Sequence, residues 1–302
     1  MPDLQKGRVA YMKKLEAFLT PTQDELFQKL SGMYQGAVGI DGHFILVKGE
    51  SPIMLIAHLD TVHKEPVRDI CTSTDGNILM SPQGIGGDDR CGVYALNKIY
   101  EQSVIKPYLL FTTDEESGGI GAKTFVKCLE QLPELKKLKL LVEIDRRGRN
   151  DAVYYDCDNP DLEEYITSKG FVTDYGTFSD ISVIAPALGI AAVNLSSGYY
   201  NAHQLHEFIN RAELEATITK GVEIVAEAAR AEFPRYEYVD AYYGYYDSWG
   251  YEDFEEPDEL PSEYEQIYRE LLEKYTEEEL EYLRGVYGNQ IIMDIYLEEQ
   301  EK

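Results

Sequence analysis

The sequence lacks any apolar stretch long enough to cross a bilayer. A transmembrane helix needs roughly 20 consecutive apolar residues, whereas the hydrophobic residues here, 44% of the 302, occur in shorter runs. The opening residues, from Met1 to Lys6, also lack the apolar segment of a signal peptide. We therefore expect no membrane span and no secretion signal, and we predict a cytoplasmic protein without a membrane partner.

Cysteine is scarce. The four cysteines, Cys71, Cys91, Cys128 and Cys157, lie far apart and form no CxxC pair. Widely spaced cysteines in a protein without a secretion signal are typically reduced. We therefore expect four free thiols and no zinc site built from cysteine.

Positive charge is also in short supply. Lysine and arginine number 28 against 55 aspartates and glutamates, which gives a net charge of −27. Nucleic acids and anionic membranes attract proteins of the opposite sign, so this balance argues against both as partners.

The negative charge is concentrated near the C-terminus. Residues 233–302 contain 21 acidic and 5 basic residues, a net charge of −16, together with 13 of the 24 tyrosines. The other 232 residues carry −11. This shift predicts a large domain over residues 1–232, followed by an acidic, tyrosine-rich linker and helical tail over residues 233–302. The amphipathic tyrosine rings favour docking of the tail on a protein surface, and the alternative is disorder.

The apolar runs predict an α/β fold. Short runs rich in Leu, Ile and Val, continuous rather than alternating, are typical of strands buried on both faces of a mainly parallel sheet. They occur at His43–Val47, Ile53–Ala57, Tyr108–Thr112, Lys139–Ile144 and Ile190–Leu195. Helical patterns lie at Leu4–Phe18, after Pro21, and at Gly92–Gln102, Gly121–Leu132, Leu162–Ser168 and Ala212–Ala231. The alternation predicts a three-layer sandwich with a mainly parallel mixed sheet.

The tail gives weaker signals. Residues 236–261 show no sustained periodicity. Three helices are then expected, at Ser262–Tyr275, Glu277–Tyr287 and Ile291–Gln300, the second capped by Thr276 with Glu279.

Polar side chains with metal-binding chemistry follow the expected strands. His58 and Asp60 come directly after Ile53–Ala57. Residues two apart on an extended chain face the same way, so both reach one place, where Asp60 could orient His58. The alternative for His58, one of five histidines, is a plain core residue at a strand end.

Asp88 and Asp89 lie in a glycine-rich loop. Glycines let the backbone approach a site closely, and a carboxylate can bridge two metal ions. The alternative is that one of the two caps the helix that follows. Both can hold, with each residue performing one task.

Glu115 and Glu116 follow the expected strand Tyr108–Thr112. Adjacent carboxylates at a strand end point in different directions, so one could bind a metal while the other handles protons. The alternative is the ordinary enrichment of acidic residues in the first turn of a helix.

Asp145 and a histidine complete the set. Asp145 ends the run Lys139–Ile144 and precedes two arginines, so an ion pair is the alternative. His203 and His206 share a polar segment, and spacing alone does not choose between them. Open α/β sheets place their sites at such strand ends, and imidazole with carboxylate suits Zn²⁺, or Mn²⁺ or Co²⁺.

In this order the motifs resemble those of the co-catalytic zinc peptidases of the M20/M28/M42 clan, and most of all its tripeptide-aminopeptidase-type members. The matching pieces lie within residues 50–210, and the tail shows no such likeness. They are His58-Leu59-Asp60-Thr61-Val62, Gly87-Asp88-Asp89-Arg90, Asp114-Glu115-Glu116, Asp145, and Gly198-Tyr199-Tyr200-Asn201-Ala202-His203 with Glu207.

The resemblance implies a role for each residue and metal-assisted hydrolysis of a peptide or other amide bond. His58 and Asp145 would bind one divalent ion, Glu116 and His203 a second, and Asp88 both. Glu115 would be the general base and acid, and Asp60 would support His58. The resemblance therefore selects Asp88 over Asp89 and His203 over His206, and it leaves contacts of His63, His206 and Asp180 with substrate open.

Two further features bear on the substrate, a short peptide or amide. In the clan, an aspartate at the position of Asp145 goes with aminopeptidases. Only 57 residues separate Asp145 from His203, too few for the lid domain of many relatives, so we expect the lid to be absent. The alternatives are an N-acyl amino-acid deacylase or other small-amide hydrolase, and a non-catalytic interaction protein acting through the acidic tail. A homo-oligomer is compatible with the sequence.

Overall fold

The structure is a computed structural model of the chain. It describes residues 14–34, 36–40 and 42–241, and further on residues 267–269, 271–272, 274–276, 280 and 295–296. The chain divides into two compact units, residues 1–248 and residues 249–302.

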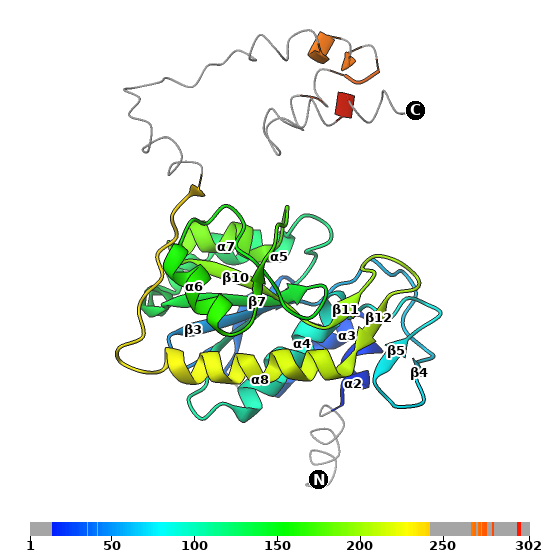
Figure 1. Ribbon diagram of the computed structural model, residues 1–302, viewed down its shortest axis with the longest axis horizontal. Helices are drawn as coiled ribbons and strands as arrows, with labels where there is room; N and C mark the ends of the chain where they lie inside the picture. The colour runs from blue at the N-terminus through cyan, green and yellow to red at the C-terminus, as the bar shows by residue number, and fades with distance from the viewer. Residues whose placement is uncertain are drawn as a thin grey trace. The chain divides into compact units, whose positions relative to one another are not determined.

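An eight-stranded mixed sheet forms the centre of the first unit (Figure 1). Its central strands β6, β3, β7 and β10 run parallel, and antiparallel strands extend it on both sides. In spatial order the strands are β1 (Val38–Ile40), β2 (Phe44–Val47), β6 (Tyr108–Thr112), β3 (Ile53–His58), β7 (Leu140–Arg146), β10 (Ala192–Ser196), β8 (Asp151–Val153) and β9 (Val172–Thr173).

Helices cover both faces of this sheet. Helices α3, α4 and α8 pack on one face and α5 and α7 on the other (Figure 1). The predicted three-layer α/β architecture is therefore confirmed. The helices are α2 (Glu16–Leu19), α3 (Gln23–Met33), α4 (Gly87–Gln102), α5 (Ile120–Lys127), α6 (Pro160–Ser168), α7 (Asp180–Leu188) and α8 (Arg211–Ala228), with 3₁₀ turns η1 (Leu129–Gln131) and η2 (Pro133–Lys137).

The continuous apolar runs are explained by burial on both faces. In β3, Ile53, Leu55 and Ala57 enter the core beneath α4 and α8, whereas Met54 and Ile56 enter the core beneath α5 and α7. Successive side chains of a strand point to opposite faces, so a strand between two helical layers has no polar side.

The helix after Pro21 begins as the sequence predicts. The Thr22 side chain accepts the backbone N–H of Glu25, and the Glu25 carboxylate accepts the N–H of Thr22. This reciprocal capping box satisfies two backbone donors of the first turn of α3. Of the helix expected at Leu4–Phe18, only residues 14–18 are described, and α2 begins at Glu16.

A second, smaller sheet is a feature that the sequence analysis did not anticipate. Its four antiparallel strands, in spatial order, are β11 (Tyr199–Tyr200), β12 (Phe208–Asn210), β5 (Ile78–Met80) and β4 (Cys71–Thr72). Strands of two or three residues are too short to show a periodicity. This sheet holds the turn between β11 and β12 that carries His203.

Residues beyond α8 continue along the first unit as far as residue 241. Phe233 and Tyr236 are buried and their rings contact the ring of Tyr165. The backbone N–H of Tyr236 donates to Lys139 and its carbonyl accepts from Ala191. These contacts place at least part of the predicted linker on the fold of residues 14–232.

In the second unit, Leu271 and Leu280 are buried, with Ile267, Tyr268, Tyr275, Ile295 and Tyr296 packed against them. Residues 267–269 and 271 are helical, within the helix predicted at Ser262–Tyr275. Most of the three predicted tail helices lies outside the described residues.

All four cysteines are among the described residues, and each is a free thiol as predicted. Within the described ranges, no helix combines the length and the apolar character that a bilayer span requires.

Candidate metal centre

The predicted ligands converge at the carboxyl edge of the parallel strands. His58 is the last residue of β3, and Asp145 lies near the end of the neighbouring β7. Glu115 and Glu116 follow β6, which pairs with β3 on its other side. Because parallel strands end at the same edge of a sheet, side chains far apart in sequence meet there.

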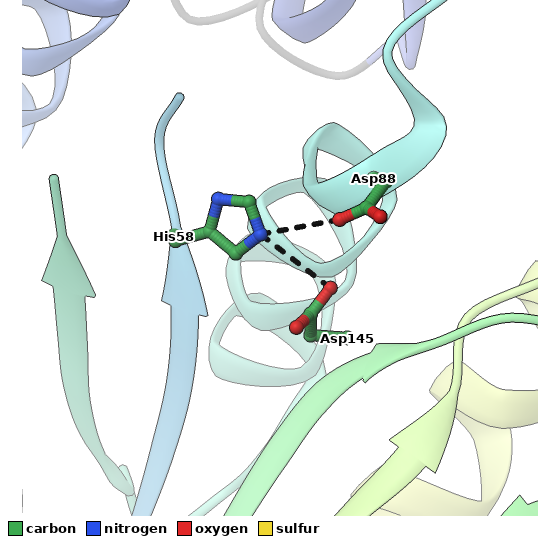
Figure 2. Close-up of side chains that lie close together, drawn as sticks. All are labelled: His58, Asp88 and Asp145. Carbon is green, nitrogen blue, oxygen red and sulfur yellow. Dashed lines mark hydrogen bonds and ion pairs between the residues drawn. The ribbon is translucent and has the colours of Figure 1, made fainter. Parts of the chain in front are cut away.

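Asp88 at the start of α4 faces His58, and Asp145 faces the same imidazole (Figure 2). His58 Nε2 lies 3.2 Å from Asp88 Oδ1 and 3.6 Å from Asp145 Oδ1. Ligand atoms of these three residues lie within 4.8 Å of one another. This is the first ligand set that the resemblance implies.

The other oxygen of Asp88 faces a second histidine. His203 Nε2 lies 3.3 Å from Asp88 Oδ2 and 3.0 Å from Glu116 Oε1. Asp88, Glu116 and His203 form a second group whose ligand atoms lie within 4.8 Å of one another. The carboxylate of Asp88 is therefore shared, one oxygen to each group.

Asp60 connects His58 to the loop of the two glutamates. Its Oδ1 lies 3.1 Å from His58 Nδ1 and accepts the backbone N–H of Glu115 at 3.1 Å. Its Oδ2 accepts the N–H of Glu116 at 3.0 Å. A single carboxylate thus fixes the imidazole and the backbone of both glutamates.

The loop between β6 and α5 is also held from α3. Asp114, in the left-handed region at φ 55°, accepts a hydrogen bond from Gln23 Nε2 and donates its backbone N–H to Gln23 Oε1. Glu115 Oε2 lies 4.0 Å from His58 Nε2. Glu115 therefore faces the space between the two ligand groups. Ligand atoms of His58, Glu115 and Glu116 also lie within 4.8 Å of one another.

Asp89 differs from its neighbour. Its Oδ1 accepts the backbone N–H of Gly92 at 2.9 Å, inside the first turn of α4, and the side chain is fully buried. The structure therefore gives one aspartate to the helix and the other to the cluster, as the sequence allows. Arg90, next in line, donates to the carbonyls of Phe18 and Pro21 and ties α4 to the segment before α3.

The two histidines left open by spacing are separated by the structure. His203, at φ 64°, contacts Asp88 and Glu116, although 51% of its side chain is exposed. His206 is exposed too, and its carbonyl accepts a hydrogen bond from Asn201 Nδ2. His63 contacts Glu207 rather than the ligands, with Nε2 2.9 Å from Glu207 Oε2.

A buried polar layer beneath the cluster was not predicted. Thr112 Oγ1 donates to the carboxylate of Asp180, and Ser179 Oγ donates to the carboxylate of Glu143. Asn194 Nδ2 donates to the carbonyl of Asp145, whose N–H donates to Asn194 Oδ1. Glu143 precedes Asp145 by two residues on the same strand face, which is the sequence signal that could have identified it.

Burial and the crowding of like charges raise the pKa values of several carboxyl groups in the metal-free protein. Burial raises the pKa of Glu115 to about 9, and the Asp145 and Asp180 carboxylates add to this effect. Burial and the nearby Asp88 carboxylate raise the pKa of Asp145 to about 7. Burial also raises the pKa of Asp180 to about 6. Neutral carboxyl groups are favoured because several buried anions cannot lie together unpaired.

The pKa values of the two imidazoles are raised as well, which favours their protonated, charged form. A hydrogen bond to Asp88 raises the pKa of His203 to about 9. Burial disfavours protonated His58, but the Asp145 carboxylate and contacts with Asp60 and Asp88 outweigh burial and raise its pKa well above the usual value. Burial alone would raise the pKa of Asp88, and its contacts with the two histidines lower it instead.

These residues fit divalent metal ions. Both ligand groups consist of imidazole nitrogen and carboxylate oxygen, the donors that zinc and similar ions accept. Glu116 Oε1 is buried and lies 3.0 Å from His203 Nε2, so the two donor atoms of this group face each other. The raised pKa values of the carboxyl groups also favour metal binding, because cations at the cluster would offset its concentrated negative charge.

The model of Peptidase family M28 matches residues 45–176. This segment contains four of the five predicted ligands, and His203 lies beyond it. No curated protein matches the sequence.

Solved structures share the fold. A tripeptidase from Staphylococcus aureus has a TM-score of 0.55 at 15% identity, covering 74% of this chain and 98% of the other. The aminopeptidase PepT from Bacillus cereus has a TM-score of 0.53 at 15% identity, covering 75% and 99%. The TET1 peptidase from Pyrococcus horikoshii has a TM-score of 0.52 at 14% identity, covering 71% and 99%.

The segment between Asp145 and His203 is part of the same α/β fold. Its residues form β8, α6, β9, α7, β10 and β11, which belong to the two sheets and their covering helices. With residues 45–176 matching Peptidase family M28 and the fold shared with a tripeptidase and aminopeptidases, the resemblance to the co-catalytic zinc peptidase clan is confirmed.

Proposed function

We propose that the protein is a two-metal-dependent aminopeptidase that acts on short peptides. The observation that carries this proposal is the shared carboxylate of Asp88, with one oxygen facing His58 and the other facing His203. A carboxylate in that position is suited to join two ion sites into one reaction centre.

His58, Asp88 and Asp145 would hold one ion, and Asp88, Glu116 and His203 the other. Zn²⁺ is the ion best suited to these donors, with Mn²⁺ and Co²⁺ as further candidates. When bound, such ions make water a stronger nucleophile and polarise the carbonyl that is attacked.

Glu115 is the residue proposed for proton transfer. Its carboxylate borders the ligand groups, and its backbone N–H is fixed by the same Asp60 that contacts His58. Glu115 accepts a proton from the attacking water and delivers it to the leaving amine. A carboxyl group whose pKa lies near the operating pH is suited to both steps. Bound cations would lower the pKa of Glu115 from about 9 towards that range.

Asp60 is proposed to act on catalysis indirectly. Its contacts with His58 and with the backbone of Glu115 and Glu116 set the distance between a ligand and the base. The preference for a substrate with a free amine rests on the aspartate at position 145, which goes with aminopeptidases in the clan.

Two measurements test the proposal. Elemental analysis of protein purified without chelator should find up to two equivalents of divalent ion, lost on dialysis against a chelator together with activity. Amino-acid anilides, dipeptides, tripeptides and N-acyl amino acids should then be compared as substrates. Turnover of N-acyl amino acids alone would make the protein a deacylase, and metal-loaded protein that cleaves none of them would refute the enzymatic proposal.

We also propose a homo-oligomer and a cytoplasmic location. The TET1 peptidase with the same fold can assemble into a tetrahedron or a large octahedral shell. Light scattering coupled to gel filtration measures the mass of the assembly, and a monomer at all concentrations would refute the first proposal. Cell fractionation tests the second.

A further inference from the structure

Glu207 is a fully buried carboxylate beside the cluster, outside the proposed ligand set. Its Oε1 accepts the backbone N–H of Asp88 at 3.0 Å. Its Oε2 accepts the backbone N–H of Gly86 at 2.9 Å and lies 2.9 Å from His63 Nε2. Three nitrogens from two loops therefore converge on one side chain.

The surroundings of Glu207 call for a hydrogen-bond acceptor at each of its carboxyl oxygens. A buried carboxylate is costly unless its charge is paired or hydrogen-bonded, and here both oxygens face N–H groups. Backbone N–H groups can only donate, so Gly86 and Asp88 need acceptors on both sides of the carboxyl group, and its two oxygens supply them. His63 is the third partner of the carboxylate, because its Nε2 faces Oε2, the oxygen that also accepts the N–H of Gly86.

The loop held in this way has little freedom. A Cβ added at Gly84 would lie 2.2 Å from the His63 ring, and one added at Gly86 would lie 2.8 Å from the Thr61 side chain. At Gly87 an added Cβ would lie 2.6 Å from Tyr199 Cβ and 3.1 Å from Glu207 Oε1. The glycines therefore let the loop lie flat against His63 and Glu207, with Asp88 at its end.

We propose that Glu207, held by His63, is a positioning residue that fixes Asp88 and thereby the spacing of the two metal ions. The inference rests on the proposed function. Glu207 acts through the backbone N–H of Asp88, while the Asp88 carboxylate faces His58 and His203.

Glu207 also belongs to the turn that carries His203. The N–H of Glu207 donates to the carbonyl of Gln204 at 3.0 Å, and β12 begins at the next residue. The same side chain thus ties the loop of the shared ligand to the loop of a second ligand. A shift of either loop would change the distance between Asp88 and His203.

Glu207→Gln tests the positioning role of Glu207 with little change in the shape of the side chain. The amide places an NH₂ group against the N–H of either Gly86 or Asp88, and neither backbone group can become an acceptor. Residues that orient metal ligands typically contribute 10–100-fold to affinity. We therefore expect the dissociation constant for Zn²⁺, measured by chelator competition, to rise roughly 10- to 100-fold.

Two readouts separate positioning from plain stability. The visible absorption of bound Co²⁺ reports ligand geometry and should change in Glu207→Gln, while the circular dichroism of the metal-free protein should match wild type. Glu227→Gln is the control, because Glu227 also accepts a hydrogen bond at each carboxyl oxygen, from Tyr165 and Lys169, but lies in α8. It should leave Zn²⁺ affinity and the Co²⁺ spectrum unchanged.

His63→Ala removes one of the three nitrogens that contact the Glu207 carboxylate and serves where Glu207→Gln fails to fold. It should weaken Zn²⁺ binding in the same direction by a smaller factor. Wild-type affinity and spectrum in either folded variant would refute the positioning role of Glu207 and leave the proposed function intact. If the wild-type protein itself binds neither ion, the proposed function and the positioning role are both refuted.

Discussion

Adjacent acidic residues in this protein have different tasks because their surroundings differ. Asp88 faces two imidazoles, whereas Asp89 accepts the N–H of Gly92 within α4. Glu116 lies against His203, whereas Glu115 borders His58 at 4.0 Å. Spacing alone only identifies such pairs. The resemblance selects Asp88, and the geometry places that residue against both histidines.

The division between the two glutamates can be tested by amide substitution. Glu115→Gln should retain metal and lose most activity, since general acid–base groups contribute about 10²–10⁴-fold. Glu116→Gln should also lose one equivalent of metal, because it removes a proposed ligand. Turnover numbers and elemental analysis of both variants provide the check. Full turnover in metal-loaded Glu115→Gln would assign the proton transfer to another group.

Metal affinity should rise with pH. In the metal-free protein the pKa of Asp145 is raised to about 7, and those of Glu115 and His203 to about 9. At neutral pH the last two groups hold protons, and at least His203 must lose its proton before it can bind metal. Titration calorimetry at pH 7, in buffers of different ionisation enthalpy, should therefore show proton release. Affinity independent of pH between 6 and 9 would contradict this account.

At the scale of elements, the site depends on where strands end and helices begin. Strands β3, β6 and β7 bring His58, the Glu115–Glu116 loop and Asp145 to one edge of the sheet, and Asp88 lies opposite them in the first turn of α4. Helix α3 contributes from outside the cluster through Gln23, which holds Asp114. The position of α3 therefore affects the loop of the proposed base.

The cap of α3 gives a prediction for stability. Thr22→Ala removes the hydroxyl that accepts the N–H of Glu25, and loss of such a cap costs about 1 kcal/mol. Urea unfolding should show this loss. Thr219→Ala is the control, because the Thr219 hydroxyl donates within α8 to the carbonyl of Glu215 and caps no helix end. Equal stability of the two variants would show that the capping box contributes nothing measurable.

How much could be predicted from sequence depended on the range of the interactions. The strand at Tyr108–Thr112 was predicted with its observed bounds, because burial on both faces makes its residues uniformly apolar. Helix α7 was missed, since its apolar residues are nearly continuous and Pro186 interrupts the pattern. The helix expected to reach Leu132 ends at Lys127 and continues as a 3₁₀ turn.

The proposed ligands and the supporting Asp60 were identified from motifs, whereas the contacts of Glu207 and Asp180 were not predicted. Glu207 contacts Asp88 from 119 positions away, and Asp180 contacts Thr112 from 68 positions away. No local pattern marks such partners, because the contact exists only once the sheet brings the loops together.

At the scale of the whole molecule, composition and packing place the C-terminal boundary of the first folded part at different residues. The rise in acidic and tyrosine content begins near Phe233. However, Phe233 and Tyr236 are 7% and 5% exposed and belong to the same core as α8. Short bridges pair Ile190 with Glu237 and Cys157 with Asp240. We therefore expect the folded part to include residues 233–241.

Two truncations test this expectation. A chain ending at residue 241 should fold with the thermal stability of the full-length protein and keep its metal content, because the contacts of Phe233 and Tyr236 remain. A chain ending at residue 232 should be less stable by about 3 kcal/mol or more, since removal of one buried phenylalanine side chain costs about 3–5 kcal/mol. Calorimetry and metal analysis of both chains provide the measurement. Equal stability of the two truncated chains would place the boundary at 232, where composition alone puts it. A marked loss of activity in the chain ending at 241, with the stability of the full-length protein, would show that the tail serves the active site.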